Sequence, residues 1–390
     1  MPFAAAVSTL PQTAQALDEV CAGARAKLDG PPHLALVFFS VHHAGDADRI
    51  AQTIFQRVTP ACLLGCVAEA VIGNDMEVEQ RPAISLWLAR WAGNVSMDPF
   101  HLTLEMTADG PSLMGLPDAL VGVEGRRAAV LLLGDPFTFP AESFLQQMND
   151  DCPGLRVMGG MASGIRGPGQ VRLLYDGVVQ RQGAVGVLLQ GAVGLRPIVS
   201  QGCRPIGKPL VVTRAQDNVI LELGGRDPMD QLRQLWSELS AQEQRQFQQG
   251  LHIGRVISEY RDVFQRGDFL VRNVIDRDRE TGGLVITDRV RVGQTVQFHI
   301  RDAATADEDL HALLQIDLSA HEKKPSAALL FSCNGRGTRL FTEPHHDAGV
   351  LRAEAGDIPV AGFFAMGELG PVGGQNFQHG YTASVALFEE

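Results

Sequence analysis

The protein has 390 residues, of which 45% are hydrophobic and 20% charged, a composition that can bury a core and excludes an intrinsically disordered chain. Its formal net charge of −12 argues against a nucleic-acid backbone or an anionic membrane as the main partner. The 42 glycines exceed the usual share of about 7% and need a structural reason, because glycine loses much backbone entropy on folding.

Apolar periodicity predicts a helix over residues 8–28, which the Pro31-Pro32 pair ends. A unit of strand, helix, strand and closing strand follows, and its second strand ends in glycine. The same order returns twice, so we interpret the chain as a repeat. The predicted elements are at 33–40, 46–56, 61–66 and 83–89, then at 128–133, 141–149, 155–160 and 184–189, and last at 327–332, 348–354, 358–362 and 382–388.

A region of different character separates the second copy from the third. It is predicted to contain a hairpin over 208–223, a helix over 229–240 and three strands at 269–275, 283–287 and 294–300. A helix then begins after Thr305, with an acidic first turn that complements the helix dipole.

The strands of the repeats are continuous runs of valine, leucine and phenylalanine, which is typical of sheets covered on both faces. We therefore expect an α/β fold (mixed α+β) of two domains, built from strand–helix–strand repeats with helix-covered sheets. The glycines at equivalent strand ends mark places where the chain turns sharply or approaches something closely.

The cysteines and the N-terminus bear on the compartment. Six dispersed cysteines without a CxxC pair are typical of reduced thiols and not of a zinc ribbon. Residues 1–10 lack the positive charge of a signal peptide, and no apolar run approaches the roughly 18 residues of a spanning helix. We expect a cytoplasmic protein with no cofactor and no bound metal.

The densest polar cluster, residues 332–337, follows the first strand of the third copy, where α/β sheets tend to bind ligands. Arg336 or Arg339 could pair with a carboxylate or phosphate there, and a glycine turn with solvated arginines is the alternative. Cys333 is a candidate nucleophile, with a base among His345, His346 and His379, but an inert thiol is the favoured interpretation.

Two further motifs are weaker evidence for a functional site. The run His345-His346-Asp347 lacks a third ligand at a spacing diagnostic of a metal site. The glycine-rich segments 159–164 and 370–375 match neither a phosphate loop nor a dinucleotide fingerprint, so tight turns are the favoured interpretation.

Several ordered motifs together resemble the FIST domains, and the resemblance covers about residues 5–389. The C-terminal half resembles the FIST C-terminal domain, and the N-terminal half resembles the FIST N-terminal domain. The C-terminal motifs are at 202–209, 267–273, 292–299, 301–307, 331–337, 362–364 and 367–371, and the N-terminal ones at 38–40, 65–66, 77–79 and 159–163.

The resemblance implies an intracellular sensor of signal transduction that binds a small polar metabolite such as an amino acid. FIST modules occur fused to histidine kinases, chemotaxis receptors and cyclic-dinucleotide enzymes, and in animals to an F-box. We expect a stand-alone member without an output domain, and therefore a separate signalling protein as its partner, with no nucleic acid or membrane. A cysteine-dependent enzyme using Cys333 and a protein–protein adaptor are the alternatives.

On this basis we expect an N-terminal helix over 1–30, a FIST N-like domain over 31–195 and a FIST C-like domain over 196–390. The resemblance transfers no catalytic residue. It suggests ligand contact by motif residues, with Arg301 and Arg336 holding a ligand carboxylate in a cleft between or within the domains. The candidate ligand-binding residues are Arg301, Asp302, Cys333, Asn334, Arg336, Glu368, Ser40, Cys66 and Ser163.

Overall fold

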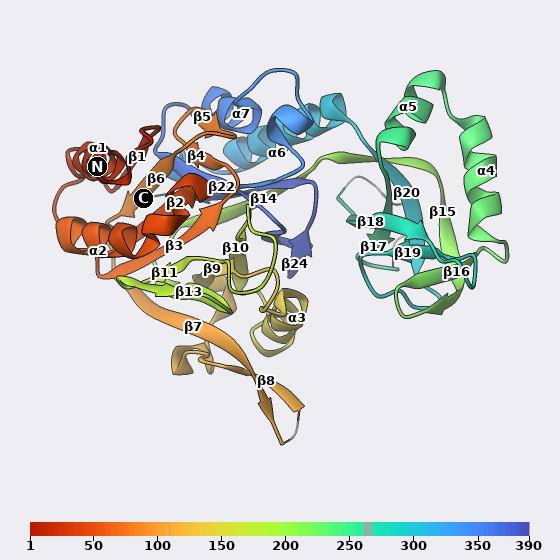
Figure 1. Ribbon diagram of the computed structural model, residues 1–390, viewed down its shortest axis with the longest axis horizontal. Coiled ribbons are helices and arrows are strands. Elements are labelled where there is room, and N and C mark those ends of the chain that lie inside the picture. The colour runs from red at the N-terminus through yellow and green to blue at the C-terminus, as the bar shows by residue number, and fades with distance from the viewer. Residues whose placement is uncertain (109, 261–263, 265–266, 390) are drawn as a thin grey trace. The chain divides into compact units, whose positions relative to one another are not determined.

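A computed structural model describes residues 1–108, 110–260, 264 and 267–389 (Figure 1). Its helices and mixed sheets form the predicted α/β fold. The chain divides into two compact units, a core unit of Met1–Val199 with Leu310–Glu390 and a barrel unit of Ser200–Asp309. The third predicted repeat therefore belongs to the same compact unit as the first two. The expected division after residue 195 instead assigns the third repeat to a different domain from the first two.

Three copies of one strand arrangement form the core unit, which confirms the predicted repeat. In each copy a central strand pairs in parallel with the strand after the helix, and antiparallel with the closing strand. These strands are β2 (Leu34–Ser40), β3 (Cys62–Ala68) and β6 (Ile84–Ala89); β9 (Ala128–Gly134), β10 (Arg156–Met161) and β13 (Ala184–Gly191); and β21 (Ala327–Cys333), β22 (Val360–Ala365) and β25 (Thr382–Phe388). The helices after the central strands are α2 (Ala47–Val58), α3 (Ala141–Asp151) and α7 (His346–Ala355).

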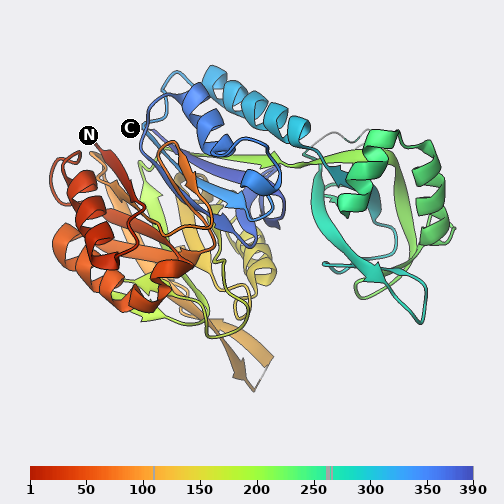
Figure 2. The ribbon, with the colours of Figure 1, turned by 45° about the horizontal axis from the view of Figure 1, so that its top comes forward.

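A further strand begins each copy and lies beside its closing strand: β1 (Phe3–Ser8), β7 (Val95–Thr107) and β14 (Leu195–Gln201). Strand β1 was not predicted from the sequence, and the helix predicted over 8–28 is shorter in the structure, where α1 covers Thr13–Arg25. Residues 3–8 are rich in alanine and lack a clear strand pattern, and their strand conformation comes from pairing with β6, a partner far along the chain. Figures 1 and 2 show α1 and α2 side by side at the first sheet.

Short hairpins connect the three copies. They are β4 (Val71–Gly73) with β5 (Met76–Val78), β11 (Leu173–Tyr175) with β12 (Val178–Gln180), and β23 (Glu368–Val372) with β24 (Gln375–His379). Each hairpin follows the parallel strand of its own copy but joins the sheet of another copy. The first pairs with β22, the second with β3 and the third with β10. The exchange runs cyclically, so every sheet needs a strand pair from another repeat.

The glycines of the three parallel strands share one position. Gly65, Gly159 and Gly362 face Val37, Leu132 and Leu330 of the central strands. A Cβ atom at these glycines would lie 2.4, 1.9 and 1.8 Å from the carbonyl oxygen of the facing residue. The prediction that they mark strand ends is wrong, because β3, β10 and β22 continue beyond them. What approaches them closely is the neighbouring strand, not a ligand.

The barrel unit is an insertion in the third copy, between β14 and α6 (Ala303–Ala320). Its strands close in the order β15-β16-β19-β18-β17-β20. They are β15 (Cys203–Gln216), β16 (Val219–Leu223), β17 (Leu251–Val256), β18 (Phe269–Arg277), β19 (Leu284–Ile286) and β20 (Thr295–Arg301), with α4 (Pro228–Glu238) and α5 (Ala241–Gln249) between β16 and β17. The predicted hairpin, helix and three strands are present. Strand β17 and helix α5 were not predicted. Helix α5 buries no residue and so lacks an apolar stripe.

Aromatic side chains from the first and third repeats meet in the largest core cluster. The ring centroids of Phe38 and Phe363 are 5.1 Å apart, and those of Phe3 and Phe388 are 5.8 Å apart. In the described part of the chain, no helix combines the length and the apolarity needed to cross a bilayer.

We expect Gly362→Ala to lower the free energy of unfolding by about 3 kcal/mol, the upper end for overpacking, because the obstacle is a backbone oxygen of β21. Gly349→Ala is the matched control. It lies inside α7, where an added Cβ atom would have no neighbour within 4 Å, so alanine should stabilise by about 0.5–1 kcal/mol. Urea denaturation measures both. Equal effects of the two substitutions would contradict the close strand approach.

Candidate functional site

The predicted site residues divide between the two units. Arg301 and Asp302 belong to the barrel unit and the other seven to the core unit. Asp302 accepts a hydrogen bond from the Thr305 backbone N–H at 3.0 Å and one from the Gln246 side chain at 3.2 Å. Burial alone would raise the pKa of Asp302, but these bonds lower it. Asp302 therefore holds the start of α6, and the single cleft that joins both groups of residues stays a prediction.

Arg336 is completely buried and carries an internal ion pair. Its Nε and Nη2 atoms each donate to the Asp347 carboxylate at 2.7 Å, and the Ser332 hydroxyl donates to the same carboxylate at 2.6 Å. Burial alone would raise the pKa of Asp347, but Arg336 holds it well below its usual range. The carboxylate expected from a ligand is therefore supplied by the protein itself, from the first turn of α7.

The exchanged hairpin of the first repeat reaches the same cluster. Glu77 of β5 accepts from the Ala348 N–H at 2.9 Å, and its own N–H donates to Nδ1 of His345 at 2.9 Å. Burial and the charge of Asp347 raise the pKa of Glu77 to about 8. Two repeats thus share one buried polar network.

The neighbouring histidines are engaged in this network as well. His346 stacks on Phe341 with ring centroids 3.4 Å apart, and its Nδ1 lies 2.9 Å from the Asp347 carboxylate. Among the described residues, no group of three or more His, Cys, Asp or Glu side chains is arranged to hold a metal ion.

Cys333 occupies a position that recurs in all three repeats. Ser40, Asp135 and Cys333 each lie three residues after the residue that faces the strand glycine. Ser40 accepts from the N–H of Ala83, just before the closing strand, at 3.0 Å. Cys333 forms a hydrogen bond with the backbone of Tyr381, just before the third closing strand. Asp135 makes the connection indirectly: the Thr138 hydroxyl donates to its carboxylate and accepts from the N–H of Gly183 at 2.8 Å. In each repeat the residue at this position therefore connects the end of the central strand to the start of the closing strand.

The chemistry of Cys333 also points away from catalysis. Burial and the nearby Glu368 raise the pKa of its thiol, which is the reverse of what a nucleophilic thiolate needs. His379, one of the candidate bases, directs Nε2 to the carbonyl of Gly370 at 2.9 Å.

Glu368, at the start of β23, is another buried carboxyl. It accepts from the hydroxyl of Thr382 at 2.8 Å and from its N–H at 3.2 Å. Burial raises the pKa of Glu368 to about 8, so it is mostly protonated at neutral pH.

Ser163 and Cys66 are also buried. The Ser163 hydroxyl donates to the carbonyl of Phe364 and accepts from the N–H of Glu69 at 2.8 Å, so it joins three repeats. Cys66 lies inside β3, where burial raises the pKa of its thiol well above the usual value. Both side chains therefore serve the packing of the core unit.

Asn334 lines a small surface depression together with Glu69, Glu79 and Arg339. Its volume is about 10 Å³, room for about one water molecule. Arg339 forms an ion pair with Glu69 across this depression. A volume this small leaves no room for a metabolite.

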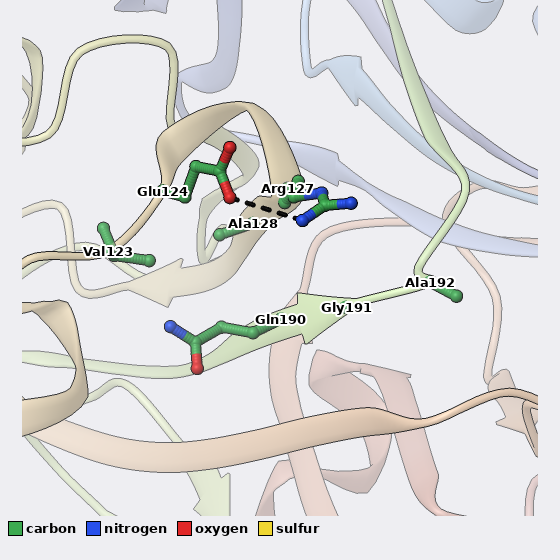
Figure 3. Close-up of a pocket in the computed structure, with 7 residues that line it drawn as sticks. All are labelled: Val123, Glu124, Arg127, Ala128, Gln190, Gly191 and Ala192. Carbon is green, nitrogen blue, oxygen red and sulfur yellow. Dashed lines mark ion pairs between the residues drawn. The ribbon is translucent and has the colours of Figure 1, made fainter.

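A pocket of about 560 Å³ lies elsewhere in the core unit, where β9 begins and β13 ends (Figure 3). This volume falls within the range of about 300–1,000 Å³ found for small-molecule sites. Glu124 and Arg127 form an ion pair of 3.5 Å, and Figure 3 shows the Gln190 side chain on the β13 wall. We call it the 124/127 pocket; its lining is Val123, Glu124, Arg127, Ala128, Gln190, Gly191 and Ala192.

Sequence reasoning missed the 124/127 pocket. Residues 124–127 form a charged loop before a strand, which is the pattern of any solvated turn. Only the spatial meeting of this loop with residues 190–192 creates the cavity.

The comparison with known proteins agrees with the sequence motifs. Residues 33–226 match the FIST N domain and residues 229–371 match the FIST C domain. The chain belongs to the FIST family. It is 41% identical over 389 residues to an uncharacterized protein of Mycobacterium tuberculosis (strain CDC 1551 / Oshkosh), covering 100% of both chains. An uncharacterized protein of Mycobacterium bovis is 40% identical, over 100% of this chain and 99% of its own. FIST domains are generally sensory domains of signal transduction.

We expect Ser163→Ala to destabilise this FIST protein by about 2 kcal/mol, because it leaves the part-buried Glu69 N–H and the buried Phe364 carbonyl without this partner. Ser143→Ala, at an exposed position of α3, is the control and should change stability by less than about 0.5 kcal/mol. Thermal and urea unfolding measure the difference. A Ser163→Ala protein as stable as the control would refute the bridging role.

The raised pKa of Glu368 predicts a pH dependence of stability. In the folded protein the Glu368 carboxyl keeps its proton up to a pKa of about 8, whereas in the unfolded chain it loses the proton above its ordinary pKa of 4.5. The free energy of unfolding therefore falls as pH rises from about 4.5 to about 8. Each such carboxyl contributes a slope of about 1.4 kcal/mol per pH unit in that window.

Glu368→Gln stays neutral and should remove one such slope between pH 5 and 7, while Glu77 keeps its own. Denaturant unfolding at several pH values measures it. The exposed Glu105→Gln on β7 is the control and should leave the slope unchanged. An unaltered slope in Glu368→Gln would show that Glu368 is ionised in the folded state.

Proposed function

We propose that this FIST protein is a non-catalytic sensor whose ligand, a zwitterionic metabolite of amino-acid type, binds in the 124/127 pocket. The observation that carries the proposal is a pocket of about 560 Å³ with one cation and one anion side by side on its wall. A carboxylate and an ammonium group on one small molecule have the matching charges.

The ion pair between Arg127 and Glu124 is easily exchanged. The Arg127 and Glu124 side chains are 77% and 72% exposed, and exposed pairs contribute only about 0–1 kcal/mol. A ligand carboxylate can therefore take the guanidinium, with two parallel hydrogen bonds, and its ammonium can take the Glu124 carboxylate. The net charge of the pocket does not change in this exchange.

The remaining wall supports a ligand of mixed polarity. Val123 and Ala192 give apolar surface for an aliphatic part of the ligand. The Gln190 amide makes only long bonds, to the Ala119 carbonyl at 3.4 Å and from the Ser96 hydroxyl at 3.3 Å, so it can reorient toward a ligand. These features favour an amino acid with an apolar or amide side chain.

Isothermal titration calorimetry against the common L-amino acids tests the proposal. Each binder is compared with its amine, which lacks the carboxylate, and with its N-acetyl derivative, which lacks the ammonium. Arg127→Ala should weaken binding of the intact amino acid at least tenfold, and Glu124→Gln should remove the preference over the N-acetyl derivative.

Two controls locate the site. Arg57→Ala removes another exposed ion-pair arginine, whose partner is Asp18, and should leave binding unchanged. Arg339→Ala opens the depression beside Asn334. The proposal is wrong if no amino acid binds, if Arg127→Ala binds as well as the wild type, or if only Arg339→Ala loses binding.

A further inference from the structure

A second cavity of the core unit has the features of a protein docking surface. Its volume is about 410 Å³, and it lies between residues 116–122 and the last turn of α3. Leu116, Leu120 and Met148 form apolar wall, and Val121 at its edge is 87% exposed. An apolar side chain this exposed beside an apolar cavity marks a surface suited to a partner. We call this cavity with Val121 and its acidic edge the docking cavity.

The edge of the docking cavity is acidic. Asp118 and Asp151 line it, both are exposed, and within the described chain neither forms an ion pair. Asp151 ends α3, whose last turn has no basic residue. The C-terminus of a helix carries partial negative charge, so an aspartate there adds to an unfavourable field that a cation would relieve. The cavity therefore suits an occupant with positive charge next to apolar groups.

Further exposed apolar side chains lie on the ribbon of β7 and β8 (Gly110–Met114). Leu104 faces Leu113 across this ribbon, and Met106 lies on the same face two residues further. Leu113 packs against the core cluster that also contains Leu120 and Met148, whereas Leu104 and Met106 are 45% and 79% exposed. A partner segment longer than one anchor residue thus has apolar surface to follow.

From this combination we infer that the docking cavity binds a basic segment of a partner protein, with one apolar side chain in the cavity and Lys or Arg side chains on Asp118 and Asp151. A second copy of the chain is a poorer occupant, because its net charge of −12 opposes the acidic edge. The inference stands without the 124/127 pocket and needs no ligand, so either proposal can fail alone.

Fluorescence anisotropy with labelled decapeptides tests the inference on the full chain. The basic amphipathic probe is two repeats of Lys-Leu-Lys-Lys-Leu, the polar probe replaces leucine by serine, and the acidic probe replaces lysine by glutamate. The basic amphipathic probe should bind at least tenfold more tightly than either of the others. Equal binding of the basic amphipathic and polar probes, or no binding, overturns the inference.

Matched variants locate the binding. Asp118→Asn with Asp151→Asn should weaken the basic amphipathic probe about tenfold, the effect of losing two ion pairs at a surface. Asp276→Asn with Glu280→Gln changes the net charge equally, at exposed positions of the barrel unit, and should have less than a twofold effect. Val121→Ser should weaken the probe several-fold, while Ile275→Ser, at a position that is 59% exposed, should not. Equal losses in the paired variants would mean nonspecific attraction and overturn the inference.

Discussion

Each repeat of the core unit completes the sheet of another repeat, and this exchange of hairpins is the constraint on which the rest of the structure depends. The strands β3, β10 and β22 would otherwise present an unpaired edge, and a hairpin from a different repeat covers each of them. The exchange also carries Glu77 of the first repeat to the helix that holds Asp347. Ser163 joins the three repeats where the parallel strands end. The repeats therefore cannot form complete sheets separately.

The sequence predicted what is local and repeated. Continuous apolar runs such as Leu34–Ser40 and Ala327–Cys333 predicted the central strands, and their recurrence predicted three equivalent copies. The role of Gly362 was misjudged because its reason is the Leu330 carbonyl on another strand, which no local pattern reveals. The hairpin exchange could not be predicted either, because it depends on pairing between residues far apart in the chain.

At the candidate site, too, the local sequence does not reveal which residues are partners. Arg336 follows a central strand in a polar cluster, and that pattern is shared by ligand sites and buried ion pairs. Its partners settle the matter: Asp347 belongs to the next helix and Glu77 to the first repeat. The bonds of Asp347 to Arg336 and of Glu77 to the N–H of Ala348 tie together the elements that meet there. Conversely, Glu124 and Arg127 resemble an ordinary solvated turn, and only their position beside residues 190–192 gives them a pocket.

One short segment lines both cavities to which we assign binding. Leu120 and Gly125 are buried and anchor it, and a Cβ atom at Gly125 would lie 2.5 Å from the Pro153 carbonyl oxygen. Between these anchors, Val121 belongs to the docking cavity and Glu124 to the 124/127 pocket. The proposed ligand would draw Glu124 away from Arg127, and Glu124 is only three residues from Val121, which the proposed partner would contact. Any coupling between the two cavities must be reciprocal, so a docked peptide would change ligand affinity by the factor with which the ligand changes docking.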